Sequence, residues 1–450
     1  MNHRTGDLTQ GPVFRNLLLF SIPFVFSTLL QSVYSMVDMM VVGQFSGSSA
    51  LSAVSISGNI IQLMTSLCVG AATGGQILIA QTAGAGKHSE IKEIVGMLAE
   101  MVIVTGILLS LASLCFSPQM LKAVEIPAEA FEQGKTYMYI CGGGMVFTAL
   151  YNMFSAIFRG MGDSRHPFIF IAIASVLNII LDYLFVAVFH MGVAGAAWAT
   201  VTGQVVSVIF SAIFLAKHKE EFCISFDREV FRFNRSLFLR LFRLGLPLAL
   251  QGSAISISAL FVARLVNQLG VAPSATFGAG QKLQSIPSII TQAVGYGVSA
   301  MAAQNLGAKK YDRVQKTVTS ALVITSCACL ICGVIFFLYP VQTFSLFTTD
   351  PDVLELAPLF IKTLVISFPA MAMMSPFNNL INGAGDTGLS FAIAIADGFF
   401  ARILLSWLLG NTFGLGILGY FLGNAFAPYI TAVPGLIYFL TGRWKLKKLV

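Results

Sequence analysis

Long apolar stretches, separated by short polar connections, extend from about residue 17 to residue 440. Their lengths are close to the ~20 residues that a helix needs to cross a bilayer. We see no alternation of apolar and polar residues that would predict the strands of a membrane barrel. The pattern predicts an all-α integral membrane protein with twelve transmembrane helices, at residues 17–43, 52–79, 92–116, 134–158, 167–190, 193–216, 243–268, 275–303, 315–340, 360–383, 388–410 and 416–440.

Glycines, prolines and polar residues within these helices and in the turns between them occur twice, about 223 residues apart. The matched sets are Gln81, Gly84 and Ala85 with Gln304, Gly307 and Ala308; Gly160, Gly162 and Asp163 with Gly383, Gly385 and Asp386; Pro23 with Pro247; and Gly192 and Gly195 with Gly416 and Gly419. We predict two pseudo-symmetric six-helix bundles of parallel topology, an N-terminal lobe at 1–216 and a C-terminal lobe at 241–450, joined by a cytoplasmic linker at 217–240. Duplication of this kind is typical of secondary transporters.

Composition supports a membrane protein, because 56% of the residues are hydrophobic and only 10% are charged. Soluble domains carry about 25% charged residues. The net charge of +7 comes from Lys and Arg gathered in one set of loops. By the positive-inside rule both termini are cytoplasmic, so the basic balance reflects topology and does not predict a nucleic-acid partner. Basic residues of the linker also suit contact with membrane lipids.

Polar residues interrupt three helices of the first half. Asp38 shares a helix face with Gln31 and Tyr34, and Asp182 follows Asn178 by one turn. Thr200 begins a third stripe with Gln204, Ser207 and Ser211. Inserting an ionisable residue at the bilayer centre costs roughly 2.5 to 3.5 kcal/mol, so such residues usually have a function. At a rise of 1.5 Å per residue, Asp38, Asp182 and Thr200 fall at one depth.

Two carboxylates at one depth can share a proton or hold a small cation, because two ionised carboxylates repel each other. We therefore predict a site for proton or cation coupling at Asp38, Asn178, Asp182 and Thr200. The alternative is that both aspartates only form hydrogen bonds to neighbouring helices.

The second half does not repeat these carboxylates, and instead carries Arg264, Lys282, Asp397 and Arg402. Asp397 and Arg402 are five residues apart, about 140° around an ideal α-helix. We therefore expect their partners on other helices. We interpret the four residues as structural charge pairs, with substrate contact as the alternative.

Neither an enzyme nor a metal protein is indicated. Of the seven cysteines, Cys327, Cys329 and Cys332 lack the two paired C-x-x-C motifs or the nearby His that would suggest a zinc site. The sequence Gly-x-Gly-Asp after the predicted fourth and tenth helices has no preceding strand and no phosphate-binding lysine, so we interpret it as a tight turn. The only cofactor expected is the coupling ion, H⁺ or Na⁺.

The chain resembles a multidrug and toxic compound extrusion (MATE) transporter, and in particular the DinF-like branch. The resemblance covers nearly the whole length, and its most specific residues are Pro23, Asp38, Asn178, Asp182 and Thr200. It implies that Gln31, Tyr34 and Asn152 line a substrate cleft, and that protonation near Asp38 bends the first helix about Pro23. It also implies a bacterial cytoplasmic membrane and export of organic cations against a proton or sodium gradient.

We therefore predict a monomeric secondary active antiporter for small amphipathic, cationic compounds. One alternative is a flippase for lipids or lipid-linked oligosaccharides, which would use the cationic residues of the second half. A membrane receptor that transports nothing is a more remote alternative. A facilitator of the sugar type is disfavoured, because the loop after the second helix lacks the G-x-x-x-D-R pattern.

Overall fold

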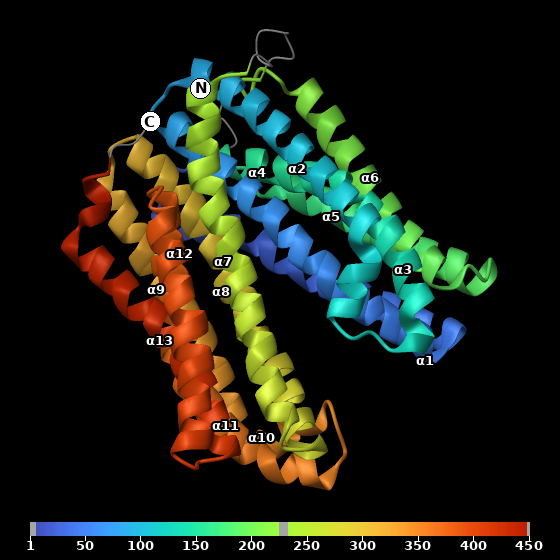
Figure 1. Cartoon of the computed structure of the whole chain (residues 1–450). Coiled ribbons are helices and arrows are strands. Elements are labelled where there is room, and N and C mark those ends of the chain that lie inside the picture. Colours follow the sequence, from blue (N-terminus) through green and yellow to red (C-terminus); the bar gives the residue numbers. More distant parts are fainter. Residues whose placement is uncertain (1–5, 225–232, 448–450) are drawn as a thin grey trace. The chain divides into compact units, whose positions relative to one another are not determined.

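The computed structural model describes residues 6–224 and 233–447, and all regular structure within those ranges is helical (Figure 1). The chain packs as two compact units. The first unit comprises Met1–Asp7 and Ile22–Ala249, and the second comprises Leu8–Ser21 and Leu250–Val450. Of the predicted linker at 217–240, residues 225–232 lie outside the described ranges.

The first unit is built mainly from the helices of the first half of the chain. They are α1 (Val13–Gly84), α2 (His88–Ala123), α3 (Ala128–Gly143), α4 (Met145–Gly160), α5 (Arg165–Asp182), the π-helix η1 (Tyr183–Val188) and α6 (Gly192–Lys217). Helix α2 packs against α3 and α4, and α5 packs against α6. Helix α6 also packs against α3 and α4, and so joins α5 to the rest of the unit.

The second unit contains the remaining helices. They are α7 (Arg235–Asn267), α8 (Val271–Gly307), α9 (Tyr311–Leu338), α10 (Pro340–Ser345), α11 (Pro351–Gly383), α12 (Thr387–Ile395), the π-helices η3 (Ala396–Leu405) and η4 (Leu408–Thr412), α13 (Ile417–Thr441) and a final 3₁₀ turn, η5 (Arg443–Lys445). Helix α11 packs against α8, α9 and α13 and forms the centre of this unit.

Each predicted span coincides with a helix or a helix pair. Within the described ranges, eight helices are long and apolar enough to cross a bilayer, with α5–η1 and α12–η3–η4 each taken as one helix, and the bent pair α3–α4 would make a ninth. Helix α1, at 72 residues, covers the first two predicted spans. Helices α8 and α13, of 37 and 25 residues, coincide with the predicted eighth and twelfth spans.

Glycines explain two departures from twelve straight helices. Between the first two predicted spans there is no loop, because α1 only breaks at Gly47, whose φ of 85° and ψ of 178° are not helical. The predicted fourth span is bent by 45° between α3 and α4, around Gly144. A Cβ atom on Gly144 would lie 2.8 Å from Val201 Cγ2, so a larger residue would not fit against α6.

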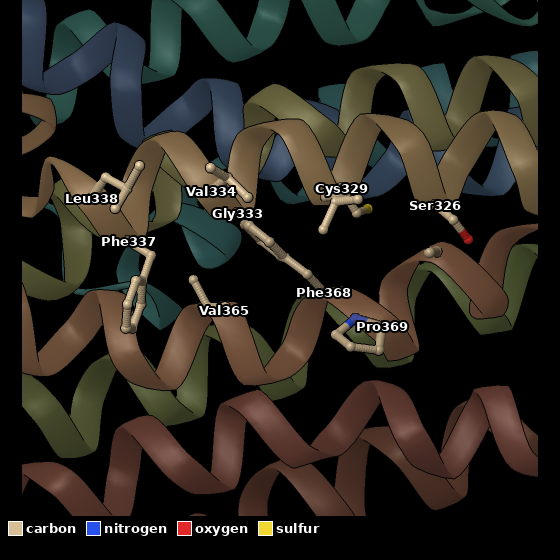
Figure 2. A pocket seen from close by; sticks show the side chains of 11 residues that line it. Ser326, Cys329, Gly333, Val334, Phe337, Leu338, Val365, Phe368 and Pro369 are labelled. Carbon is tan, nitrogen blue, oxygen red and sulfur yellow. The ribbon is translucent and has the colours of Figure 1, made fainter.

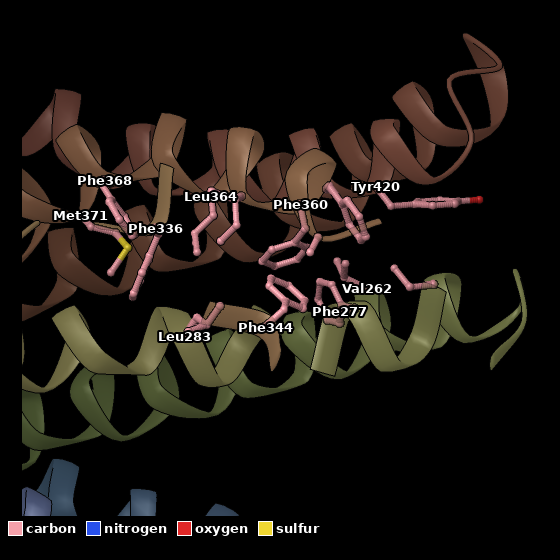
Figure 3. Packing of buried hydrophobic residues seen from close by; sticks show 14 of the residues in the cluster. Val262, Phe277, Leu283, Phe336, Phe344, Phe360, Leu364, Phe368, Met371 and Tyr420 are labelled. Atoms are coloured by element: carbon pink, nitrogen blue, oxygen red, sulfur yellow. The ribbon is translucent and has the colours of Figure 1, made fainter. Parts of the chain in front are cut away.

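Aromatic side chains form the core of the second unit (Figure 3). The ring of Phe360 packs edge-on against that of Phe421 with centroids 4.8 Å apart, and Phe277 stacks parallel to Phe421. Gly280 makes room for this cluster, since a Cβ atom there would lie 2.1 Å from the Phe360 ring. The core thus ties α8, α11 and α13 together.

The compact units depart from the predicted lobes at the ends of two helices. Residues Leu8–Ser21, which include the start of α1, pack in the second unit, and α7 packs in the first unit up to Ala249. Small residues allow this, because a Cβ atom on Gly70 would lie 2.2 Å from the backbone nitrogen of Ala249. Both changes of unit fall within two residues of a proline, Pro23 or Pro247.

Candidate functional site

Helix α1 has a polar face and an apolar face beyond Pro23. Asp38 is buried, and Gln31 and Tyr34 on the same face are half-buried. The opposite face exposes apolar side chains at helical spacing: Phe26, Leu29, Val33, Met36 and Met40. Because residues three and four apart share a helix face, the predicted polar stripe does point into the first unit.

Asp182 ends α5 and is completely buried, and the π-helix η1 begins at the next residue. Asn178 lies one turn before it and is also buried. With its amide oriented to satisfy both neighbours, Asn178 Nδ2 donates to Asp182 Oδ2 at 3.2 Å, and its Oδ1 accepts from the Thr200 backbone N–H at 3.2 Å. Asn178 therefore links the carboxylate on α5 to α6.

The two carboxylates interact with each other. Asp38 and Asp182 lie close enough for charges on them to interact, and both lie near the phenol of Tyr34. Within the described part of the chain, Asp38 Oδ1 and Asp182 Oδ1 are buried without a hydrogen-bond partner. The structure thus brings Asp38, Asn178, Asp182 and Thr200 together, as the sequence predicts.

A small cavity of about 20 Å³ lies beside this group. Its lining includes Tyr34, Asn178 and Thr200, together with Ser175 and Gln204. A volume of this size holds about one water molecule. Ser175 Oγ and Gln204 Oε1 are also buried without a partner among the described residues. Neither was predicted as a site residue, although Gln204 belongs to the polar stripe of Thr200 and Ser175 lies one turn before Asn178 on α5.

Chemically, the group is rich in acceptors and poor in donors. Asp38 Oδ1, Asp182 Oδ1 and Gln204 Oε1 accept no hydrogen bond from the described residues. The Asn178 amide, which donates to Asp182, does so through the other carboxylate oxygen, Oδ2. Unpaired buried acceptors are costly, so a proton or a small cation would stabilise the site. The arrangement suits reversible binding of a positive charge.

Two further predicted residues lie outside this group of contacts. Asn152 donates from Nδ2 to the Thr148 carbonyl of its own helix at 2.8 Å, and is half-buried. Pro23 lies inside α1, where its ring removes the N–H that would bond the carbonyl of Leu19. Ser27 Oγ donates to the Pro23 carbonyl at 2.8 Å. The roles of Asn152 in a cleft and of Pro23 in bending stay predictions.

The charged residues of the second half behave differently from one another. Contrary to the sequence-based expectation, Asp397 and Arg402 pair within one helix, with Arg402 Nη2 3.2 Å from Asp397 Oδ1. The expectation was wrong because η3 is a π-helix, whose bonding between residues five apart brings the two side chains together. Thr431 Oγ1 donates to Asp397 Oδ2 at 2.9 Å.

Arg264 and Lys282 do not form such pairs. Both are exposed, and among the described residues neither has an ion-pair partner. The interpretation as structural charge pairs therefore holds for Asp397 and Arg402 and not for these two.

An apolar groove of about 610 Å³ lies between α9 and α11 (Figure 2). Its lining includes Leu330, Val334, Phe337, Phe368 and Pro369, and none of the predicted site residues. Ligand sites combine apolar walls with a few placed polar groups. We therefore interpret this groove as lipid-facing surface.

The duplicated all-helical architecture and the buried acidic site define a multi-span membrane transporter. The chain belongs to the MatE family, whose profile matches residues 23–184 and again residues 247–408. The two matched segments correspond to the two halves of the duplication. This is a family of transporters, not of enzymes.

The relatives are similar over nearly their whole length. "Probable multidrug resistance protein YpnP" of Bacillus subtilis is 28% identical, with 98% of each chain covered. "Multidrug export protein MepA" of Staphylococcus aureus is 23% identical over 90% of this chain and 89% of its own. A solved MOP superfamily transporter from Pyrococcus furiosus, described as having a binding pocket of reverse polarity, has a TM-score of 0.91 at 20% identity, with 98% of both chains covered. It shares the fold.

Proposed function

We propose that this protein exports small amphipathic, cationic organic compounds in exchange for protons. The observation that carries the proposal is the pair of buried carboxylates, Asp38 and Asp182, each with an oxygen that has no partner among the described residues. A positive charge bound there would neutralise their mutual repulsion. Relatives named for multidrug resistance and export support an organic substrate.

The finer assignments belong to the same proposal. The set of Pro23, Asp38, Asn178, Asp182 and Thr200 supports the DinF-like branch of the family. The distribution of Lys and Arg supports cytoplasmic termini in a bacterial cytoplasmic membrane. Gln31, Tyr34 and Asn152 remain the residues proposed for the substrate cleft.

The lipid flippase is the second candidate, and the structure weakens its main support. It relied on three cations in the second half, but Arg402 is committed to Asp397. Of these three cations, Arg264 and Lys282 are the two that are exposed and could contact an anionic headgroup.

Transport by purified protein in vesicles tests the proposal directly. We would impose pH and sodium gradients independently and follow a fluorescent organic cation, with protein-free vesicles as control. We expect efflux driven by the pH gradient alone. Efflux driven only by sodium would replace the proton as the coupling ion, and movement of lipid-linked anions without movement of the organic cation would establish the flippase instead.

A further inference from the structure

The segment that leads into α1 is bound to the turn between α8 and α9, within the second unit. The Leu8 N–H donates to Gln304 Oε1 at 3.1 Å, and Asn305 Nδ2 donates to the Leu8 carbonyl at 3.2 Å. Lys310 Nζ donates to the carbonyl and the hydroxyl of Thr9 at 2.9 and 3.0 Å. Gln304 and Asn305 are both buried, so the segment is held by polar side chains of the packed interior; we call these residues, with Lys310 and Arg313, the seat.

Arg313 is the centre of this seat. Its Nη1 donates to the Gly11 carbonyl at 2.8 Å, and its Nη2 donates to the carbonyls of Leu8 and Gln10 at 3.2 and 2.9 Å. Its Nε donates to Asn305 Oδ1 at 3.0 Å. Hydrogen bonds from a charged donor are about twice as strong as neutral ones. One guanidinium therefore gathers the backbone just before α1 onto the start of α9.

The duplication shows that this chemistry is special to the second copy. The positions that correspond to Lys310 and Arg313 in the first copy are Lys87 and Glu90, each 223 residues earlier. Lys87 Nζ pairs with Glu90 Oε1 at 3.1 Å, and both side chains are nearly half exposed. In the second copy the acidic partner has become an arginine, so both cations are available to bind backbone carbonyls. A turn that only connects two helices would not need an arginine in place of the glutamate.

Helix α1 connects this seat to the acidic site. Its first turns pack in the second unit, where a Cβ atom on Gly297 would lie 2.7 Å from Leu17 Cδ1. Asp38 lies on the same helix in the first unit. Pro23 falls between the two, two residues after the change of unit, where the missing hydrogen bond makes the helix easiest to bend. With its start held in the second unit, α1 can respond to a change at Asp38 by bending at this point.

We propose that Arg313 is a positioning residue for coupled transport. By holding residues 8–11 it fixes the N-terminal end of α1, so that charge neutralisation at Asp38 bends the helix at Pro23 instead of sliding it along its axis. This inference rests on the proposed function, since it needs a cation-coupled Asp38. It adds to that function an anchor for α1 in the second unit, which does not contain Asp38 and Asp182.

A double-mutant cycle tests the anchor. We would measure the initial rate of gradient-driven ethidium efflux from vesicles for Arg313→Ala, for deletion of residues 8–11, and for both changes together. We expect Arg313→Ala and the deletion each to lower the rate about tenfold, and the combination to be no slower than either, because both remove the same contact. Arg313→Lys should restore most of the rate, since a lysine can still donate to these carbonyls. Lys316→Ala, at an exposed site one turn along α9, is the matched control and should transport like wild type.

Two further readouts separate an anchor from a folding role. Ethidium affinity in detergent should change less than about twofold in every variant, because the residues proposed for the substrate cleft are not among those changed. If Arg313→Ala elutes as aggregate, Arg313→Gln, which stays polar but loses the guanidinium, takes its place in the cycle. Wild-type rates for Arg313→Ala, or an equal further loss when it is added to the deletion, would overturn the anchor. If wild-type vesicles move no ethidium under either gradient, the proposed function fails first and the anchor falls with it.

Discussion

Asp182→Asn isolates the charge of the acidic site from its packing. Asp182 is fully buried and accepts from Asn178 Nδ2 at 3.2 Å. Asparagine has the same shape, and its carbonyl oxygen can still accept that bond, so we expect the protein to fold. Asp182→Leu would leave the Asn178 amide without its acceptor, at a cost of about 1 to 3 kcal/mol. The asparagine variant therefore tests chemistry, and the leucine variant tests stability.

The size of the effect follows from the driving force. If one proton exchanges for one monovalent cation, the membrane voltage cancels and only the pH difference acts. One pH unit is worth about 1.36 kcal/mol, which corresponds to a tenfold accumulation ratio. Asp182→Asn cannot take up the proton at this position, so we expect the ratio to fall from about ten towards one.

The assay is the steady-state distribution of a fluorescent organic cation across vesicles held at a difference of one pH unit. Asp38→Asn is expected to behave like Asp182→Asn, because both carboxylates belong to the same buried group. Asp397→Asn serves as the matched control, since Asp397 is equally buried but pairs with Arg402. An undiminished ratio in both Asp38→Asn and Asp182→Asn would refute a coupling role for this site.

Three stability predictions follow from the backbone and from the buried ion pair, each measured by thermal unfolding in detergent. Lys309 adopts a φ of 57° where the first copy has Gly86 at 74°, so Lys309→Gly should stabilise by about 1 kcal/mol and Gly86→Ala should destabilise; equal melting curves would argue against backbone strain. Gly70→Ala should cost about 1 to 3 kcal/mol by pushing against the α7 backbone, whereas Gly58→Ala, with open space around it, should not. Arg402→Ala should cost about 3 to 5 kcal/mol because it leaves a buried aspartate unpaired, and a smaller loss would mean that water replaces the guanidinium.

The hydrophobic pattern predicted the helices well because a bilayer leaves a spanning segment few alternatives to a helix. It could not predict the break at Gly47, which rests on the positive φ of a single residue within a continuous apolar stretch. It could not predict the bend at Gly144 either, where the backbone lies close against Val201 of α6. Nor could it predict that the starts of α1 and α7 pack in different units from the rest of these helices. The hydrophobic pattern marks which face of a helix is apolar, but the shapes of the packed side chains determine which neighbouring helix that face contacts.

The acidic site was more predictable than the charged residues of the second half. Polar side chains on an otherwise apolar helix must face inward, and the helical period placed Asp38, Asn178 and Asp182 on the correct faces. The same period failed for Asp397 and Arg402, because it assumes 3.6 residues per turn and η3 does not obey it. A π-helix has no reliable signal in sequence.

The two copies of the duplicated scaffold have diverged at different places, and α1 connects both changes. The first copy carries the carboxylates, while the position equivalent to Asp38 on α7 falls near Val262, which is completely buried in the apolar core of the second unit. The second copy carries Arg313, where the first has an exposed Lys87–Glu90 pair. Arg313 holds the residues just before α1, and Asp38 lies within α1 beyond Pro23. The proposed anchor therefore predicts that a charge bound at Asp38 acts on a helix whose start is held in the second unit.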